Sequence, residues 1–375
     1  MVKMNDQYFP IVRAKQGEIE AFENLKPVVL GRCTPVFEVT KLDGQDLERA
    51  RKRSDTPYED YLDSRAASIA GIFKGKHVMV DISQWPTGFS TEGGEQVLSY
   101  LCNRLNVLGV ISCPVIGYDR WDSVEYREMV KSISLPAKAF FCIRLDSIAL
   151  EDLGDPEHFD GIIEDISAQV NIVESETPVL VDIGDVTQIP MQEVVEYIES
   201  AYAHMMGMGF KYIIMAGSSI PDSIEKAVKK VDSTGLVQRK EMIAWKGFMS
   251  ANPKASLYFG DYGIRNPRAS DVIAPDMNVK IRYTINNSFF IVRGHSVRKE
   301  GGYAQSQDLS RILVQSPYFL DGFSWGDDKI LECSRGEIVG SSTNWISFDT
   351  NHHISTVASE VREFVSELEV SVART

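Results

Sequence analysis

Short apolar runs alternate with amphipathic stretches over the first two thirds of the chain. Eight runs are rich in β-branched and aromatic residues, and we predict strands at 8–13, 34–40, 77–83, 110–118, 139–145, 178–184, 211–217 and 256–262. The stretches between them have helical spacing, as in Val97, Leu101, Leu105 and Leu108. Nearly continuous apolar strands that alternate with helices are typical of a parallel sheet covered on both faces. Residues 1–266 are therefore predicted to form an α/β fold, a (β/α)8 TIM-like barrel.

The pattern changes after Asn266. Residues 278–294 hold two β-rich runs around "INNS", which predicts a hairpin. A helix-like stretch at 304–316 and an aromatic turn at 318–328 follow. The apolar stripe formed by Val357, Val361, Phe364 and Leu368 predicts a terminal helix. We expect residues 267–375 to form a C-terminal extension that packs on the barrel.

Composition narrows the function. A net charge of −14 and a pI near 5.0 exclude broad, non-specific nucleic-acid binding, although a local basic groove stays open. The five cysteines form no CxxC pair and are typical of reduced, buried thiols. The start of the chain has no signal-like apolar segment, and no apolar run has membrane-spanning length. We expect a cytoplasmic protein with no membrane association.

In barrel enzymes the chemistry lies where strands end and the following loops begin. Four carboxylates interrupt apolar runs at these predicted ends: Glu38, Asp81, Asp182 and Asp261. A carboxylate in such a run needs a partner if it is buried.

Three arrangements would satisfy these carboxylates. A Mg²⁺ ion prefers oxygen ligands, and Glu38, Asp81 and Asp182 are the candidate ligands. Alternatively, Lys15, Arg144 and Arg282 neutralise the carboxylates and form a charged ring that binds a polar substrate. The third arrangement is a set of salt bridges that join strand ends to loops.

The loop after the seventh predicted strand is a candidate phosphate site. Ser218 and Ser219 lie in a small-residue loop that leads into a helix, and barrels often bind phosphate there. Plain helix capping by Ser218 or Asp222 explains the same residues. Tyr262 at the end of the eighth strand and Arg293 in the hairpin are further candidates for substrate binding.

"DTNHHIS" places His352 and His353 side by side. We predict an extended segment here and a terminal helix whose N-cap is Ser355 or Thr356, so that the two rings point to opposite sides. One ring would pack beneath the helix, and the other would reach the barrel mouth as a donor to an anion or as a proton shuttle. Since no further His or Cys has suitable spacing, zinc is not expected. The chain also lacks GxSxG, P-loop and GxGxxG motifs.

Several segments resemble a known family. "YFPIVRAKQGEIEAF", "TPVFEV", "FSWGDDKILEC" and "TNWISFDTNHHIST" are similar to the phage and bacterial beta protein family. The resemblance spans nearly the whole chain. It implies a setting in phages and antiviral-defence loci rather than a particular reaction.

Two functions remain open from the sequence. In the first, the rim acts on a nucleotide or nucleic-acid phosphate as a metal-assisted hydrolase or phosphodiesterase. The four carboxylates and Lys15 would be catalytic, and Arg144 and Arg293 would bind the phosphate. In the second, the chain is a non-enzymatic binding or sensing module for a phage or host protein, such as a partner in a defence system. Its contact surface would be the aromatic tail, whose residues would otherwise pack on the barrel: Tyr318, Phe319, Phe323, Trp325 and Trp345.

Overall fold

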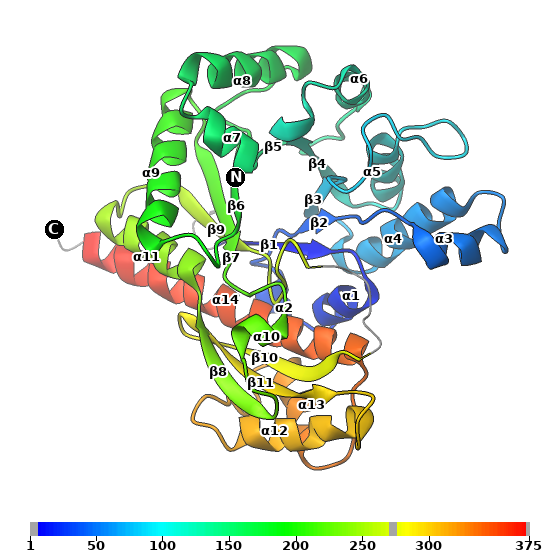
Figure 1. The fold of residues 1–375 in the computed structure, drawn as a ribbon. Coiled ribbons are helices and arrows are strands. Elements are labelled where there is room, and N and C mark those ends of the chain that lie inside the picture. Colours follow the sequence, from blue (N-terminus) through cyan, green and yellow to red (C-terminus); the bar gives the residue numbers. More distant parts are fainter. Residues whose placement is uncertain (1–6, 270–275, 373–375) are drawn as a thin grey trace.

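Eight parallel strands close into a barrel, as predicted (Figure 1). The computed structural model describes residues 7–269 and 276–372. The barrel strands are β1 (Tyr8–Arg13), β2 (Val36–Glu38), β3 (His77–Asp81), β4 (Ile111–Gly117), β5 (Cys142–Leu145), β6 (Pro178–Asp185), β7 (Tyr212–Ser218) and β9 (Leu257–Asp261). Each strand falls within or beside its predicted range, and β1 pairs with β9 to close the ring.

Helices surround the barrel in the connections between strands (Figure 1). They are α1 (Gln16–Glu23), α2 (Pro27–Leu30), α3 (Gly44–Arg51), α4 (Pro57–Phe73), α5 (Val97–Val107), α6 (Val124–Ser132), α7 (Ser147–Asp152), α8 (Pro156–Val170), α9 (Met191–Gly207) and α11 (Lys240–Ala251), with a short 3₁₀ turn, η1 (Tyr118–Arg120). Within the described ranges, no helix is both long enough and apolar enough to cross a bilayer.

The extension is built on a three-stranded antiparallel sheet. The predicted hairpin is present as β10 (Asn278–Ile285) and β11 (Ser288–Ser296). The third strand, β8 (Ser233–Gln238), lies in the connection between β7 and β9, where no strand was predicted. Short helices cover the sheet: α10 (Ile224–Ala227), η2 (Gly302–Gln305), α12 (Ser306–Val314) and α13 (Trp325–Ser334). The sheet thus takes one strand from the half of the chain assigned to the barrel.

The terminal helix is much longer than predicted. α14 runs from Ser342 to Val372, so the predicted N-cap at Ser355 or Thr356 is wrong. The first half of α14 looks polar because its polar side chains are buried and bonded to neighbouring elements. Asn351, for example, donates to the Ala21 carbonyl of α1 at 2.8 Å. A helix buried on nearly all sides loses the amphipathic pattern on which sequence prediction depends.

A buried ion network fixes α14 to the barrel. Arg239, which is fully buried, donates to Glu360 of α14 at 2.6 Å. Lys246 of α11 donates to the other oxygen of the same carboxylate, also at 2.6 Å. Asp261, at the end of β9, lies 3.7 Å from Arg239 and 3.1 Å from His353 of α14. Charges on three elements therefore hold the last helix against the outside of the barrel.

Loss of the Glu360 charge should weaken this attachment. Glu360→Gln keeps the side-chain shape but leaves two cations without their carboxylate, and breaking a buried pair typically costs about 3–5 kcal/mol. Urea unfolding should show a loss of that order. Glu363→Gln, on the exposed side of α14, is the control and should change the unfolding free energy by less than about 0.5 kcal/mol. Equal effects of the two variants would contradict a stabilising role for the network.

Candidate functional site at the barrel mouth

The residues at the strand ends divide by the side of the sheet that they occupy. Side chains alternate along a strand, and the barrel interior is filled by a small apolar cluster that includes Ile11, Val36, Met79, Cys142 and Leu180. Two residues further along each strand, the same side carries the interior residues of the mouth: Arg13, Glu38, Asp81, Arg144 and Asp182. Most of the predicted rim therefore converges at one place.

Arg144 lies at the centre of this group. Its guanidinium contacts Glu38 at 2.8 Å, Asp81 at 2.5 Å and Asp182 at 2.6 Å. It also donates to the Tyr262 hydroxyl at 2.6 Å, and that hydroxyl donates to Asp182 at 2.6 Å. All five side chains are buried or nearly so. Of the three cations named in the second predicted arrangement, Arg144 contacts these carboxylates, whereas Arg282 pairs with Asp349.

A second arginine adds positive charge to this group. Arg120, from η1, donates to Asp81 at 2.9 Å, so that two guanidinium groups face three carboxylates. Burial alone would raise the pKa of Asp81, but Arg120 and Arg144 hold it below its usual value. Burial raises the pKa of Glu38, and Asp81 and Asp182 raise it further while Arg144 opposes them. Glu38 is therefore more inclined than Asp81 to hold a proton.

Asp261 does not join this group. It lies next to Tyr262 in sequence, and so on the outer side of the barrel. There it accepts hydrogen bonds from the Tyr8 hydroxyl and, at 2.9 Å, from the Gly263 amide. His353 and Arg239 lower its pKa against the effect of burial. Asp261 thus belongs to the attachment of α14.

The two histidines lie within α14, not in an extended segment. His353 Nε2 lies 3.1 Å from Asp261, and its Nδ1 lies 2.7 Å from the Thr284 hydroxyl. His352 lies 3.0 Å from Asp327 and 2.8 Å from the Thr284 carbonyl. Both rings are fully buried between α14 and the extension. The structure brings neither of them to the mouth.

Further predicted site residues are Ser218, Ser219 and Arg293. Ser218 donates to the Arg265 carbonyl at 2.9 Å, which fixes the loop after β9. Ser219 donates to buried Glu241 and accepts from the Lys240 amide at 2.8 Å, as a residue that caps the start of α11 would. Arg293 donates to the Val228 carbonyl at 2.7 Å and holds the segment before β8, away from the mouth.

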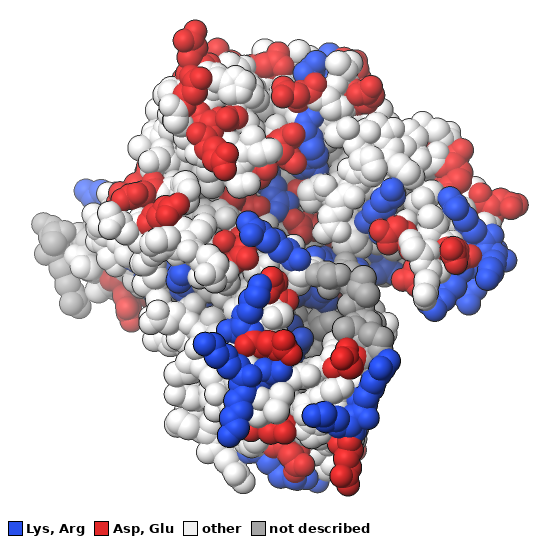
Figure 2. Space-filling model, in the orientation of Figure 1, with Lys and Arg blue, Asp and Glu red and all other residues white. Residues whose placement is uncertain are grey.

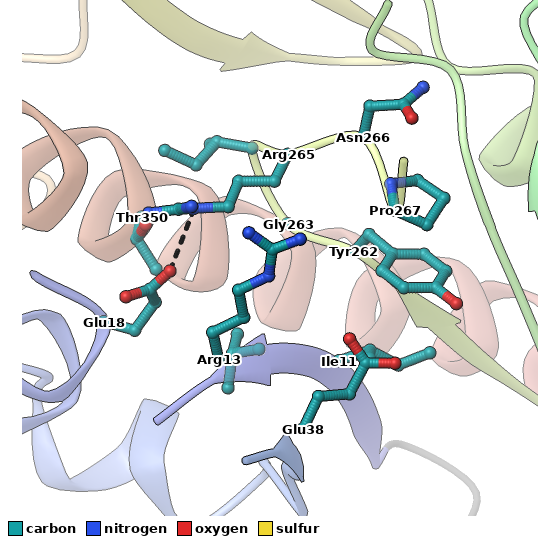
Figure 3. Close-up of a pocket in the computed structure, with 12 residues that line it drawn as sticks. Ile11, Arg13, Glu18, Glu38, Tyr262, Gly263, Arg265, Asn266, Pro267 and Thr350 are labelled. Atoms are coloured by element: carbon teal, nitrogen blue, oxygen red, sulfur yellow. Dashed lines mark ion pairs between the residues drawn. The ribbon is translucent and has the colours of Figure 1, made fainter. Parts of the chain in front are cut away.

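A recess opens beside the carboxylates, between the barrel and the extension. Figure 3 shows Arg13 between the Glu18–Arg265 ion pair on one side and Glu38 and Tyr262 on the other. Arg265 and Glu18 approach to 2.9 Å. The enclosed space is about 20 Å³, enough for about one water molecule. In this conformation the long side chains fill most of the site.

Arg13 and Arg265 line this recess. The charges of three further cations act on Glu18 or Arg265, and we call all five the mouth cations: Arg13, Lys15, Arg265, Lys280 and Arg282. The carboxyl groups near them are Glu18, Glu38 and Asp349, and Asp349 pairs with Arg282 at 3.0 Å. Burial lowers the pKa of Lys280 to about 8, and nearby Arg282 and Arg265 contribute. Burial likewise raises the pKa of Asp349 to about 6. The recess therefore concentrates positive charge where solvent screens it poorly.

Sequence reasoning missed three of the mouth cations, Arg13, Arg265 and Lys280, and the carboxylates Glu18 and Asp349 as site residues. Lys280 lies two residues before Arg282, so both side chains point to the same side of the strand. This spacing is visible in "VKIRY". Arg265 lies four residues after β9, and Asp349 lies in the part of α14 that was predicted to be extended. Only the packing of the extension on the mouth brings these groups to Arg13.

A metal has little room among the three interior carboxylates, because Arg144 contacts each of them. Among the residues that the structure describes, no group of three or more His, Cys, Asp or Glu side chains is arranged to hold a metal ion. A Mg²⁺ ion at Glu38, Asp81 and Asp182 would have to displace the guanidinium.

Comparison with known proteins places the chain in a family. A family model described as Beta protein matches residues 8–359, nearly the whole chain. The chain belongs to the beta protein family. A search of curated proteins found no match. Among solved structures, a GH18 chitinase from Pseudoalteromonas aurantia is similar at a TM-score of 0.36 and 11% identity, over 56% of this chain and 93% of that chain. A likeness of this size carries no conclusion about the site.

Removal of the Arg144 charge should destabilise the barrel in a pH-dependent way. Arg144→Met leaves three buried carboxylates facing Arg120 alone, and we expect a loss of about 3–5 kcal/mol at pH 8. The loss should shrink at pH 5, where the carboxyls protonate more readily. Urea unfolding at both pH values measures it, with exposed Arg362→Met as the control. A loss that is the same at both pH values would argue against this charge balance.

Glu241 should make stability fall as the pH rises. Burial raises its pKa from 4.5 to about 7, so the folded state keeps a proton that the unfolded chain releases above about pH 4.5. The resulting stabilisation is complete below that pH and is lost as the pH rises to about 7, a change on the order of 3 kcal/mol. Glu241→Gln should flatten the unfolding free energy between about pH 5 and 7.5, while exposed Glu199→Gln should leave the slope unchanged. Parallel curves for Glu241→Gln and wild type would refute the assignment.

Proposed function

We propose that the barrel mouth binds a phosphate-bearing ligand, either a nucleotide or a nucleic-acid end. The excess of positive charge at the recess carries the proposal. Five mouth cations face three carboxyl groups, Glu18, Glu38 and Asp349, and the pKa values of Lys280 and Arg282 are lowered by burial and by neighbouring cations. A bound phosphate would relieve that repulsion, and charge-assisted bonds from guanidinium groups to phosphate oxygens are among the strong ones.

The small size of the recess indicates how binding would occur. Arg13 and Arg265 occupy the space that a phosphate needs (Figure 3). Both are long side chains, so they can swing aside and contact the ligand from its edges. Glu38 and Tyr262 form the opposite wall and would face the sugar or leaving group. The Lys15 backbone lies at the N-cap of α1, so that Lys15 begins the first helix after β1.

Glu38 is the group suited to proton transfer if the ligand is also hydrolysed. It lines the recess, and its raised pKa is what a general acid or base near neutral pH requires. Phosphate-ester hydrolysis would then use the mouth cations for charge stabilisation and Glu38 for the proton. The setting in phages and antiviral-defence loci that the family resemblance implies is compatible with a nucleotide or nucleic-acid ligand.

The binding-module alternative has less support. Trp345 is buried, and Tyr318, Phe319 and Trp325 pack against the apolar cluster of the extension. Trp325 and Phe348 form an edge-on ring contact at 5.3 Å. These aromatics therefore pack within the extension itself, whereas the simpler explanation from the sequence placed them between the extension and the barrel.

Titration calorimetry with AMP and with inorganic phosphate tests the proposal. We expect wild type to bind both, and Arg13→Gln and Lys280→Gln each to weaken binding at least about tenfold, because each removes a charge-assisted contact. Arg335→Gln, at the exposed residue that follows α13, is the matched control and should bind as wild type does. Glu38→Gln should retain binding and lose any hydrolysis of AMP.

Two results would overturn the proposal. One is the absence of phosphate and AMP binding in folded wild type at low ionic strength. The other is equal affinity in wild type, Arg13→Gln and Lys280→Gln, with circular dichroism showing that all three are folded.

A further inference from the structure

The sheet of the extension has two edges, and the chain covers one of them. β10 forms the covered edge, and α14 supplies partners for its outward backbone groups. Asp349 accepts from the Arg282 amide at 3.1 Å, and His352 Nε2 lies 2.8 Å from the Thr284 carbonyl. A register shift near the start of β10 also interrupts this edge. β8 forms the other edge of the sheet (Figure 1).

Three residues of β8 direct their backbone groups away from the sheet. The Arg239 amide donates to the Asn287 carbonyl at 2.9 Å, so the hydrogen bonds to β11 fall on the odd-numbered residues of this antiparallel pair. The amides and carbonyls of Thr234, Leu236 and Gln238 therefore point to the open edge. Within the described part of the chain, these six groups have no hydrogen-bond partner.

The open edge lacks the usual protection against pairing with another strand. Natural edges are commonly blunted by charged side chains, proline or a bulge. Thr234, Leu236 and Gln238 are uncharged and exposed, and the register of β8 with β11 is unbroken. Leu236 lies opposite buried Phe290, on the face that carries the apolar cluster of the extension, yet it is 56% exposed. A strand added at this edge would cover it.

The outward groups match a second copy of the same strand. Antiparallel pairing about a two-fold axis at Leu236 sets this residue opposite itself and sets Thr234 opposite Gln238 of the other copy. All six outward groups of each copy then have a partner. The two Leu236 side chains lie on the same face of the joined sheet and contact each other. The edge is thus self-complementary, as an interface between two identical surfaces requires.

Charge at the two ends of β8 favours the same orientation. Asp232 precedes the strand and pairs with His295 at 2.8 Å. Lys240 follows the strand, and its ammonium donates to three backbone carbonyls but, among the described residues, to no carboxylate. Antiparallel pairing brings the Asp232 end of one copy beside the Lys240 end of the other, so that opposite charges approach.

The basic segment before β8 argues against a parallel pair. Lys229 and Lys230 are exposed there, and Figure 2 shows Lys and Arg side chains gathered over α10 and β8. A parallel pair would place the two basic segments side by side. An antiparallel pair places them at opposite ends of the joined strands, where they do not repel each other.

We propose that the open edge of β8 pairs with the same edge of a second copy, and that the protein forms a two-fold dimer with its axis at Leu236. The two three-stranded sheets then become one continuous antiparallel sheet. A short edge and one apolar contact bury less surface than a standard interface, so we expect a weak dimer with a Kd of about 1–100 µM. The dimer uses none of the mouth cations and is independent of the proposed function.

Sedimentation of the full chain over a concentration series tests the dimer. Wild type should change from monomer to dimer between about 1 and 500 µM. Leu236→Lys and Leu236→Glu each place like charges across the axis and should weaken dimerisation at least about tenfold. An equimolar mixture of these two variants should restore it, because opposite charges then meet. Val107→Lys, at an exposed apolar residue of α5, is the matched control and should dimerise as wild type does.

Cross-linking through an added cysteine tests the register. The five native cysteines are buried, so a thiol on the exposed edge of β8 can be oxidised selectively. Leu236→Cys should give a disulfide-linked dimer, because directly opposed residues of a hydrogen-bonded pair lie about 5.5 Å apart at Cα. Thr234→Cys should remain unlinked, because the same residue of the other copy lies four positions away along the strand.

Three results would overturn the proposal. The first is a wild type that stays monomeric up to about 500 µM, which removes the second copy as the occupant of the edge. The second is a dimer that Leu236→Lys leaves intact, or a mixture of the two charged variants that stays monomeric. The third is equal cross-linking of Leu236→Cys and Thr234→Cys. If circular dichroism shows that a charged variant is unfolded, the comparison of the two cysteine variants decides.

Discussion

The alternation of side chains in a closed parallel barrel determines which residues can meet at the mouth. In each strand every second residue faces the interior, and the interior is narrow enough for side chains to fill it. Glu38, Asp81 and Asp182 share this side and therefore must be neutralised together. Arg144 of β5, the strand next to β6, does so, with Arg120 also bonded to Asp81. Without these guanidinium groups, three buried carboxylates would face one another.

The same constraint assigns Asp261 to a different task. Asp261 directly precedes Tyr262 in the sequence, so the two side chains point to opposite sides of the sheet. The Asp261 side chain therefore lies on the outer side of the barrel. There it meets Arg239 and His353, through which α14 is attached. One strand end thus contributes both to the candidate site and to the joint that holds the extension over it.

Much of the fold followed from local pattern, because eight apolar strand runs survive in the sequence almost intact. The interior carboxylates and Arg144 could also be found, since each interrupts such a run. The helical conformation of His352 and His353 could not be predicted in this way. Their segment is surrounded by other elements. Its buried polar side chains form hydrogen bonds with those elements, so the sequence shows no periodic spacing of apolar and polar residues there. The contribution of Lys280 to the mouth likewise depends on how the β10–β11 hairpin packs against the barrel. This packing involves segments far apart in the sequence, so it cannot be predicted from one stretch alone.

The place of β8 has a consequence for how the chain reaches its native state. This strand is made before β9, the last strand of the barrel, yet its partner in the described sheet is β11, about fifty residues further on. Synthesis up to residue 266 therefore yields a barrel sequence with one strand still lacking its partner. Since α14 also packs on α1, the two ends of the chain meet late. Barrel and extension are interleaved, so neither half can be removed, exchanged or inherited as an independent module.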